Sequence, residues 1–135
     1  MTAHCLGAAA EIYNALYPDF SDLSVLLHSF GGDISWVRKF LDRGAFFSFS
    51  AAIMHPNRRR TRELFKSIPR DRLLLETDAP YMALPPGGNS PAPLPGPLDL
   101  PRVYEFAARE RGENPEDLRA ALARNFQNFL SGIPQ

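Results

Sequence analysis

The chain has 135 residues, which suffice for one domain with an ordinary core but make about half of a complete eight-stranded barrel. Its 15 basic and 15 acidic residues leave no net charge, which excludes a protein that coats nucleic acid or an anionic membrane with its whole surface. The single cysteine, Cys5, excludes an intrachain disulfide framework. Neither a signal-peptide pattern nor an apolar run of about 20 residues stands out, so we expect a cytoplasmic protein that binds no membrane.

Short apolar runs alternate with segments of helical periodicity along the first 80 residues. The pattern predicts strands over residues 2–5, 23–28, 45–50 and from Leu73 onward. Between them it predicts helices over 8–16, after Asp33, and over 56–68. In the second helix, Asp33 would cap the N-terminus, Ile34, Val37, Phe40 and Leu41 would share a face, and Gly44 would end the element. Strands that alternate with helices in this way form parallel βαβ units.

The remainder of the chain has a different composition. Residues 84–101 hold seven of the 13 prolines and three glycines, a density that excludes a regular helix or a central strand. We expect a rim loop over 82–101, then helices from about Leu100 to Arg111 and from Pro115 to Leu130, the second capped by Asn114. The predicted fold class is thus α/β, a parallel (β/α) half-barrel with two C-terminal helices, in a single domain over 1–135.

Polar residues end or follow three of the predicted strands. His4 and His28 lie 24 residues apart, one βα unit, and Asp78 follows His28 by 50 residues, two units. Because parallel strands all point the same way, residues at equivalent strand ends gather at one rim of the sheet. Two imidazoles and a carboxylate there predict a divalent-metal site, with structural hydrogen bonding or loop capping as the alternatives. Glu76 shares a strand face with Asp78 and would either support the metal ligands or pair with a buried basic group.

The densest basic run of the chain opens the third predicted helix, just after His55, and comprises Arg58, Arg59, Arg60 and Arg62. If this run faces the rim, its cations and the helix N-terminus would contact phosphate groups. An ordinary solvated helix face is the alternative interpretation. His55 and Arg58 are therefore candidate substrate-binding residues.

Four sequence elements occur in a characteristic order: His28-Ser-Phe-Gly-Gly, Phe47-Ser-Phe-Ser, Pro69 to Tyr81, and Asn125 with Phe129-Leu130. Within the third, Glu76-Thr-Asp-Ala-Pro-Tyr81 is the most specific. Together they resemble the C-terminal half of TatD-like metal-dependent deoxyribonucleases, which are barrel hydrolases related to the amidohydrolase superfamily. The resemblance covers nearly the whole chain and implies a half-barrel that corresponds to strands 5–8 of a TIM barrel.

The resemblance implies roles for individual residues. His4 and His28 match the histidines that end the fifth and sixth barrel strands, and Asp78 matches the aspartate that ends the eighth. The histidines would hold a divalent ion, Mg, Mn or Zn, in a site of one or two ions, while Asp78 would bind metal or accept a proton from the attacking water. Asn89 belongs to an Asn-x-Pro of the rim loop and becomes a further substrate-binding candidate. The implied activity is hydrolysis of phosphodiester bonds, with DNA as the substrate.

Several features of the family are missing from this sequence. The family opens with a His-x-His pair on its first strand and supplies a bridging glutamate from its fourth, and this chain has neither. Leu6 stands where the family places an arginine, and the rim loop lacks the usual basic residues. Fewer cations near the phosphate predict a weaker hold on the substrate. We therefore expect the chain alone to be incomplete or inactive.

A half-barrel leaves two open sheet edges and an apolar inner face, which must be covered. Self-association, a second polypeptide that supplies the N-terminal half-barrel, and truncation of a longer protein are the three explanations that the sequence leaves open. Two alternatives to the nuclease also remain: a non-catalytic half-barrel that serves as a binding or assembly module, and an amidohydrolase-like esterase or amidase.

Overall fold

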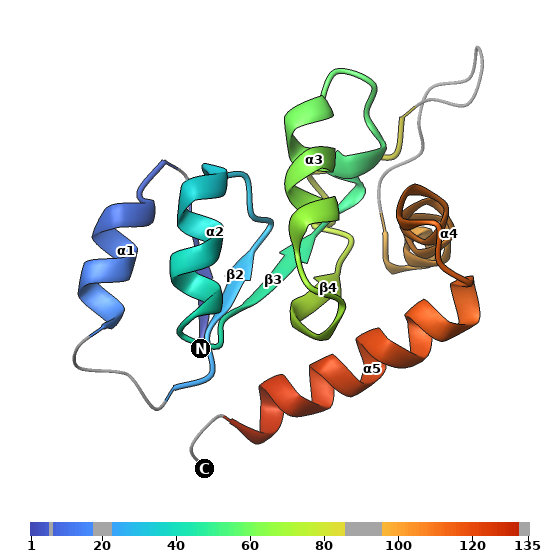
Figure 1. Cartoon of the computed structure of the whole chain (residues 1–135). Coiled ribbons are helices and arrows are strands. Elements are labelled where there is room, and N and C mark those ends of the chain that lie inside the picture. Colours follow the sequence, from blue (N-terminus) through green and yellow to red (C-terminus); the bar gives the residue numbers. More distant parts are fainter. Residues whose placement is uncertain (6, 18–22, 86–95, 133–135) are drawn as a thin grey trace.

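The computed structural model describes residues 1–5, 7–17, 23–85 and 96–132. Its centre is a parallel sheet in the order β1-β2-β3-β4 (Figure 1), as the alternating pattern predicts. The strands are shorter than expected and comprise β1 (Thr2–His4), β2 (Leu26–His28), β3 (Phe46–Phe49) and β4 (Leu73–Leu75). In the pairing register His4 lies beside His28, and Ser48 lies beside Leu74. Equivalent strand ends therefore meet at one rim.

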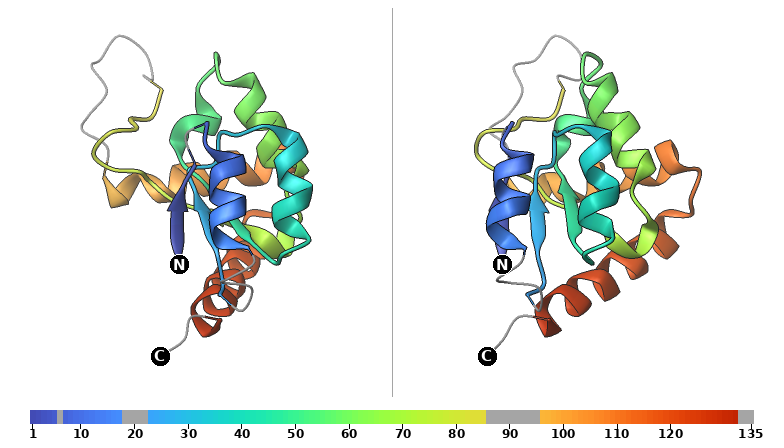
Figure 2. Two further views of the ribbon diagram at one scale, coloured as in Figure 1. Left: turned by 90° about the vertical axis from the view of Figure 1, so that its left-hand side faces the viewer. Right: turned by 60° about the vertical axis from the view of Figure 1, so that its left-hand side comes forward.

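The described residues form five α-helices around this sheet: α1 (Ala9–Leu16), α2 (Ile34–Leu41), α3 (Arg59–Ser67), α4 (Leu100–Arg111) and α5 (Pro115–Ser131). Figure 2 shows α1, α2 and α3 on the same face of the sheet, while α5 runs past the ends at which the strands begin. Three short 3-10 turns, η1 (Ala51–Met54), η2 (Arg70–Arg72) and η3 (Pro97–Asp99), complete the described elements. No described helix is both long and apolar enough to cross a membrane.

Side-chain caps fix where two of the helices begin. The Asp33 carboxylate accepts a hydrogen bond from the Ser35 amide at 2.9 Å, which confirms the predicted cap of α2. Asn114 caps α5 by accepting bonds from the amides of Glu116 and Asp117 at 2.9 and 3.3 Å. These caps satisfy amides that have no partner within the helix.

Two sequence expectations need correction. Ile34, predicted on the buried face of α2, leaves 57% of its surface exposed, because it is the first residue of the helix and extends beyond the packed turn. The third helix begins at Arg59 and not at Pro56, since η1 and the residues after it occupy the connection from β3. The turn η3 lies within the predicted rim loop, and Asn89 and Leu6 lie outside the described residues.

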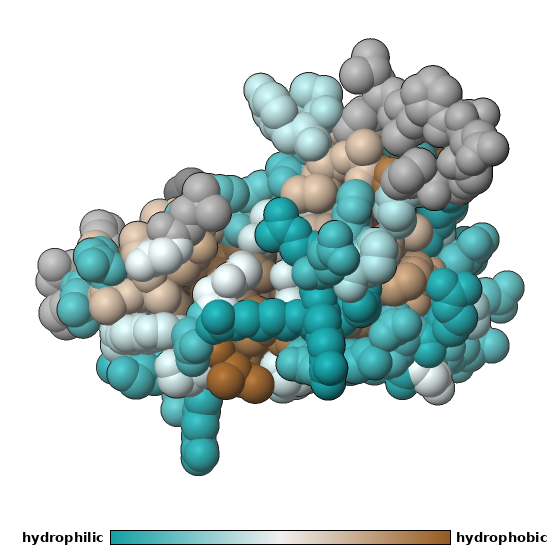
Figure 3. All heavy atoms as spheres, turned by 90° about the horizontal axis from the view of Figure 1, so that it is seen from above, coloured by the Kyte–Doolittle hydropathy of each residue, from teal (hydrophilic) through white to brown (hydrophobic). Residues whose placement is uncertain are grey.

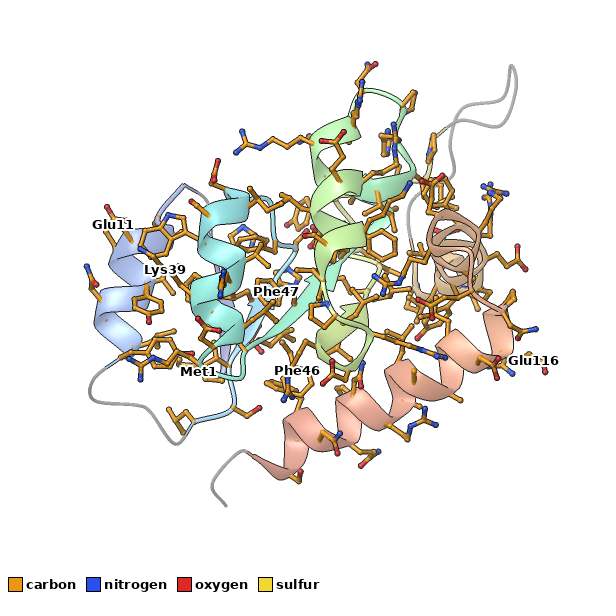
Figure 4. All side chains as sticks on the ribbon, viewed as in Figure 1. Met1, Glu11, Lys39, Phe46, Phe47 and Glu116 are labelled. Carbon is orange, nitrogen blue, oxygen red and sulfur yellow. The ribbon has the colours of Figure 1, made fainter. Side chains whose placement is uncertain are left out.

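Residues of β3 are buried on both of its faces. On one face, Phe47 packs edge-on against Phe30 with ring centroids 5.1 Å apart, beneath the helices. On the other, the ring centroid of Phe46 lies 5.9 Å from that of Phe129 of α5, and Figure 4 shows Phe46 on the side of the sheet that faces α5. Packing therefore covers the strand from both sides, and Cys5 is buried in the first layer.

Asn125 joins α5 to the start of β4. Its side-chain amide donates to the carbonyl oxygens of Arg70 at 2.6 Å and Leu73 at 2.8 Å, and only 4% of the residue is exposed. One side chain therefore satisfies two backbone acceptors, of which the bond to Leu73 is buried.

Replacement of Asn125 by alanine should lower the free energy of unfolding by about 2 to 3 kcal/mol, because both carbonyl groups lose their donor. Urea denaturation of the two proteins measures the difference. The matched control is Asn128→Ala, an exposed position on the same helix, which should change stability by less than about 0.5 kcal/mol. Equal effects of the two substitutions would contradict the anchoring role of Asn125.

Candidate functional site

The predicted metal ligands meet at the rim to which the strands point. His4 ends β1 and His28 ends β2, and their ring centroids lie 5.4 Å apart. Asp78 follows β4, and its Oδ1 lies 3.4 Å from Nε2 of His28. Viewed from this end, the molecule exposes apolar surface in the midst of polar side chains (Figure 3). The structure thus brings together three residues that are far apart in the sequence.

His28 lies between two carboxylates. Its Nδ1 is 2.6 Å from Oε2 of Glu76, and its Nε2 faces Asp78. When Nδ1 carries the proton and donates it to Glu76, Nε2 presents a lone pair toward the rim. A carboxylate behind an imidazole is the usual arrangement for orienting a metal-ligating histidine. The position of Glu76 therefore suits the supporting role that we expected for it.

Ser48 belongs to the same network, although the sequence analysis did not single it out. Its hydroxyl donates to Oε2 of Glu76 at 2.9 Å and accepts a hydrogen bond from the Ser29 amide at 3.2 Å. The residue is 1% exposed. The signal that could have found it is the alternation in Phe47-Ser-Phe-Ser, which places Ser48 on the face of β3 opposite to Phe47.

Burial raises the pKa of the Glu76 carboxyl group above its ordinary value of 4.5. The hydrogen bonds from His28 and Ser48 favour the charged form and oppose this effect, but desolvation is the larger cause. Both of these bonds reach Oε2, and Oε1 is buried without a partner among the described residues. The group therefore keeps its proton to a higher pH than an exposed glutamate.

Two residues at the rim adopt left-handed backbone conformations. Ser29 has φ 47° directly after β2, and Asp78 has φ 46° in the loop after β4. Such angles are unfavourable for residues other than glycine and are concentrated at functional sites. The carbonyl of Asp78 accepts a hydrogen bond from the Tyr81 amide at 3.0 Å, which closes a tight turn beneath the carboxylate.

The donor set fits a divalent cation in kind, because neutral imidazole and carboxylate are ordinary ligands of Zn and related ions. The described residues do not form a complete ligand set, since they contain no group of three or more His, Cys, Asp or Glu side chains that is spaced to hold a metal. His4 is exposed, and its contact in the site is the tilted ring of His28. A complete coordination shell therefore needs a further contribution.

The basic run after His55 divides into residues with different surroundings. Arg62 donates to the carbonyl groups of Ile53, His55 and Pro56 and so holds the connection between η1 and α3. Exposed ion pairs join Arg59 to Glu63 at 2.9 Å and Arg60 to Asp33 at 2.6 Å. For these three arginines the structure favours a structural or solvated role.

His55 and Arg58 instead line a groove of about 440 Å³ together with Pro56, Asn57, Met82 and Pro85. The His55 ring is held in place, because its Nε2 lies 2.8 Å from the carbonyl oxygen of Ala83. The groove thus connects η1 with the loop that follows Asp78. Among the substrate-binding candidates, these two residues share a surface.

A second cavity, of about 410 Å³, lies against the inner face of the sheet. Glu76 and Ser48 line it at the rim, and the rest is lined by apolar side chains of the sheet, α4 and α5 together with Arg119 of α5. We call this cavity the inner hollow. It places an apolar volume directly beside the hydrogen-bond network of His28.

Comparisons with known proteins identify the family of this chain. The model of the TatD-related DNases matches residues 1–131. The "3'-5' ssDNA/RNA exonuclease TatD" of Citrobacter rodentium is 34% identical over 132 residues, which are 94% of this chain and 49% of the relative. The "Uncharacterized metal-dependent hydrolase YcfH" of Escherichia coli K12 is 34% identical over 114 residues, 82% of this chain and 40% of the relative.

Solved structures agree with the sequence comparisons. The TatD homologue YJJV of Escherichia coli superposes with a TM-score of 0.80 and 26% identity over 95% of this chain and 48% of its own. The chain thus spans about half the length of the relatives that it matches. The family match extends over nearly the whole sequence and includes the strands, the rim residues and the C-terminal helices, so the chain belongs to the family of TatD-related DNases.

Proposed function

We propose that this chain contributes to a metal-dependent hydrolase that cleaves phosphodiester bonds in nucleic acid. The observation that carries the proposal is the convergence of His4, His28 and Asp78 at the strand ends, with Nε2 of His28 3.4 Å from the Asp78 carboxylate. Relatives named as an ssDNA/RNA exonuclease and as a metal-dependent hydrolase support the reaction class. We assign the four strands to positions 5–8 of the family's barrel and the protein to the cytoplasm.

In this mechanism His4, His28 and Asp78 would hold a divalent ion, Mg, Mn or Zn. The ion would activate water and neutralise the charge that develops on the phosphate. Asp78 also has the position of a proton acceptor, because its carboxylate is partly exposed at the rim beside the imidazole. The number of ions, one or two, depends on ligands that the described residues do not include.

Glu76 acts on the site through His28. By accepting a hydrogen bond from the Nδ1–H group of His28, it keeps the proton on Nδ1 and leaves Nε2 unprotonated and turned toward the rim, while Ser48 holds the carboxylate in place. Glu76 is thus a positioning residue in this proposal. Its burial and the hydrogen bonds of Ser48 make the orientation of His28 a property of the fold and not of the bound ion.

The groove at His55 and Arg58 would receive part of the nucleic-acid strand. Arg58 lies on the wall of the groove, and no ion pair occupies it among the described residues. A guanidinium there would neutralise a phosphate, and Asn89 of the rim loop would contribute a further polar contact. DNA or RNA is therefore the proposed substrate class.

A non-catalytic binding module is the second candidate function. The observation that favours it is that no group of three or more His, Cys, Asp or Glu side chains among the described residues is placed to hold a metal ion. Such a module would bind single-stranded DNA without added metal, and Asp78→Ala would leave that binding unchanged. The amidohydrolase-like esterase or amidase stays a further alternative, which parallel assays on DNA and on small esters would separate.

Asp78→Ala and His28→Ala should each reduce the affinity for Zn²⁺ or Mn²⁺ by at least about tenfold, because each removes a ligand at the rim. Asp78→Ala should also abolish any metal-dependent cleavage of single-stranded DNA. Isothermal titration with the metal and a gel assay of DNA cleavage measure the two effects. His55→Ala is the control, since this histidine bonds to the Ala83 carbonyl and should leave metal affinity unchanged. Equal loss in all three variants would contradict the assignment.

Arg58→Ala should weaken binding of single-stranded DNA and lower the slope of log affinity against log salt by about one, because one phosphate contact is lost. Fluorescence anisotropy with labelled DNA over a salt series measures both. Arg59→Ala removes the same charge from the adjacent residue, the first of α3, which pairs with Glu63. An effect of Arg59→Ala as large as that of Arg58→Ala would show that general charge, and not the groove, governs binding.

Glu76→Gln should change how stability depends on pH in the metal-free protein. The folded state raises the Glu76 pKa above 4.5, so it holds the proton more tightly than the unfolded chain does. The wild type should therefore lose stability relative to Glu76→Gln as the pH rises from about 4.5 through the raised pKa, and the difference should be constant above it. Urea denaturation in EDTA over a pH series measures this difference. A difference that does not vary with pH would contradict the raised pKa.

A further inference from the structure

The imidazole of His55 is held in one tautomer. Its Nε2 lies 2.8 Å from the carbonyl oxygen of Ala83, and a carbonyl oxygen can only accept a hydrogen bond. Nε2 therefore carries the proton, and in the neutral ring Nδ1 keeps a free lone pair. Among the described residues, none donates to Nδ1, and the atom is not buried without a partner. The groove that His55 lines thus has a hydrogen-bond acceptor whose identity the fold determines.

The backbone around this ring is also fixed. The carbonyl oxygen of His55 accepts hydrogen bonds from the amide of Arg58 at 3.0 Å and from the guanidinium of Arg62 at 2.7 Å. His55 and Arg58 are therefore parts of one closed turn. Their side chains enter the groove from positions that the turn sets relative to each other.

The other walls of the groove differ from His55 in chemistry. Arg58 adds a positive charge, and α3 begins directly after it without a side-chain cap, so the positive end of the helix lies at the same place. Pro56, Met82 and Pro85 add apolar surface. A volume of about 440 Å³ is in the range of sites that hold a small ligand. The groove thus combines a cation, an acceptor and apolar walls.

The groove is joined to the rim through Asp78. The carbonyl oxygen of Asp78 accepts a hydrogen bond from the amide of Met82 at 3.3 Å, and Met82 lines the groove. Both walls come from described segments, one from the connection between η1 and α3 and the other from the loop after β4 (Figure 1). A chain molecule that lies in the groove would therefore pass close to the carboxylate of Asp78.

The acceptor at Nδ1 does not suit a phosphate group. Phosphate oxygens only accept hydrogen bonds, so they would meet the lone pair of Nδ1 without a proton between them. A nucleobase does suit it, because every base has an N–H donor on its Watson–Crick edge, and proteins read unpaired bases on that edge. The guanidinium of Arg58 suits the phosphate of the same nucleotide, and the apolar walls suit the base.

We propose that His55 accepts a hydrogen bond from the Watson–Crick edge of a nucleobase and thereby makes the groove selective for single-stranded nucleic acid. In a duplex the same donors are occupied by the complementary base and cannot reach the imidazole. His55 is then a specificity-determining residue, while Arg58 supplies affinity that does not depend on the base. This proposal rests on the proposed function for the class of substrate, which is nucleic acid.

Two substitutions separate the two nitrogen atoms of the His55 ring. The longer side chain in His55→Gln can still donate to the Ala83 carbonyl in place of Nε2, but it leaves no acceptor at the position of Nδ1. The shorter side chain in His55→Asn places an oxygen at the position of Nδ1 and does not reach Ala83. Circular dichroism and urea denaturation establish that both variants are folded.

Fluorescence anisotropy in EDTA, which prevents cleavage, measures the binding of a labelled single-stranded oligonucleotide. His55→Gln should weaken binding by about three- to tenfold, because one hydrogen bond to the base is lost. His55→Asn should weaken it less, because an acceptor remains. If His55 only supports the loop at Ala83, the order is reversed, since His55→Asn removes that support and His55→Gln keeps it.

A strand of the same length without bases isolates the contact with the base. The wild type and His55→Gln should bind this abasic strand equally, whereas Arg58→Ala should weaken the binding of both strands. A duplex of the same length gives the second comparison. The preference of the wild type for single strands over the duplex should decrease in His55→Gln by the same factor as its affinity for the single strand.

The outcomes separate the contact from the chemistry. Equal binding of the oligonucleotide by the wild type and His55→Gln, an equal loss on the abasic strand, or weaker binding by His55→Asn than by His55→Gln would overturn the proposal. Metal-dependent cleavage could persist in that case, and the proposed function would stand. Base-dependent binding that His55→Gln reduces, without cleavage at any added metal, would support the proposal and contradict the hydrolase.

Discussion

The structure depends on the burial of β3 from both sides. Phe47 and its neighbours on one face hold the helices α1, α2 and α3 against the sheet, and Phe46 on the other face holds α5. Because side chains alternate along a strand, the same four residues also turn Ser48 toward the site. Packing and site geometry are consequently set by one short segment, and a change of register in β3 would displace both together.

The fold was largely predictable from the sequence because its signals are local. Apolar runs between helical segments predict parallel strands, and Asp33 and Asn114 act as the caps that their positions suggest. The convergence of His4, His28 and Asp78 also follows from topology, since parallel strand ends share a rim. The exposure of Ile34 did not follow, because periodicity defines a helix face but not where the packed turn ends.

The finer features of the site depend on contacts that no local pattern encodes. The pairing of His28 with Glu76 spans 48 residues, and the role of Ser48 depends on the register between β3 and β4. The basic run looks uniform in the sequence, yet Arg62 donates to backbone carbonyl groups, Arg59 forms an exposed ion pair, and Arg58, which precedes α3, lines the groove. Long-range geometry, and not residue type, distinguishes them.

The inner hollow has a consequence for the electric field at the rim. Its walls are mostly carbon, so they screen charge far less than water does. A positive charge placed beside His28 would be felt strongly by Glu76, which lines the hollow, and its attraction would favour loss of the Glu76 proton. The cavity beneath the site would thus transmit the arrival of a cation to a buried acid without any movement of the backbone.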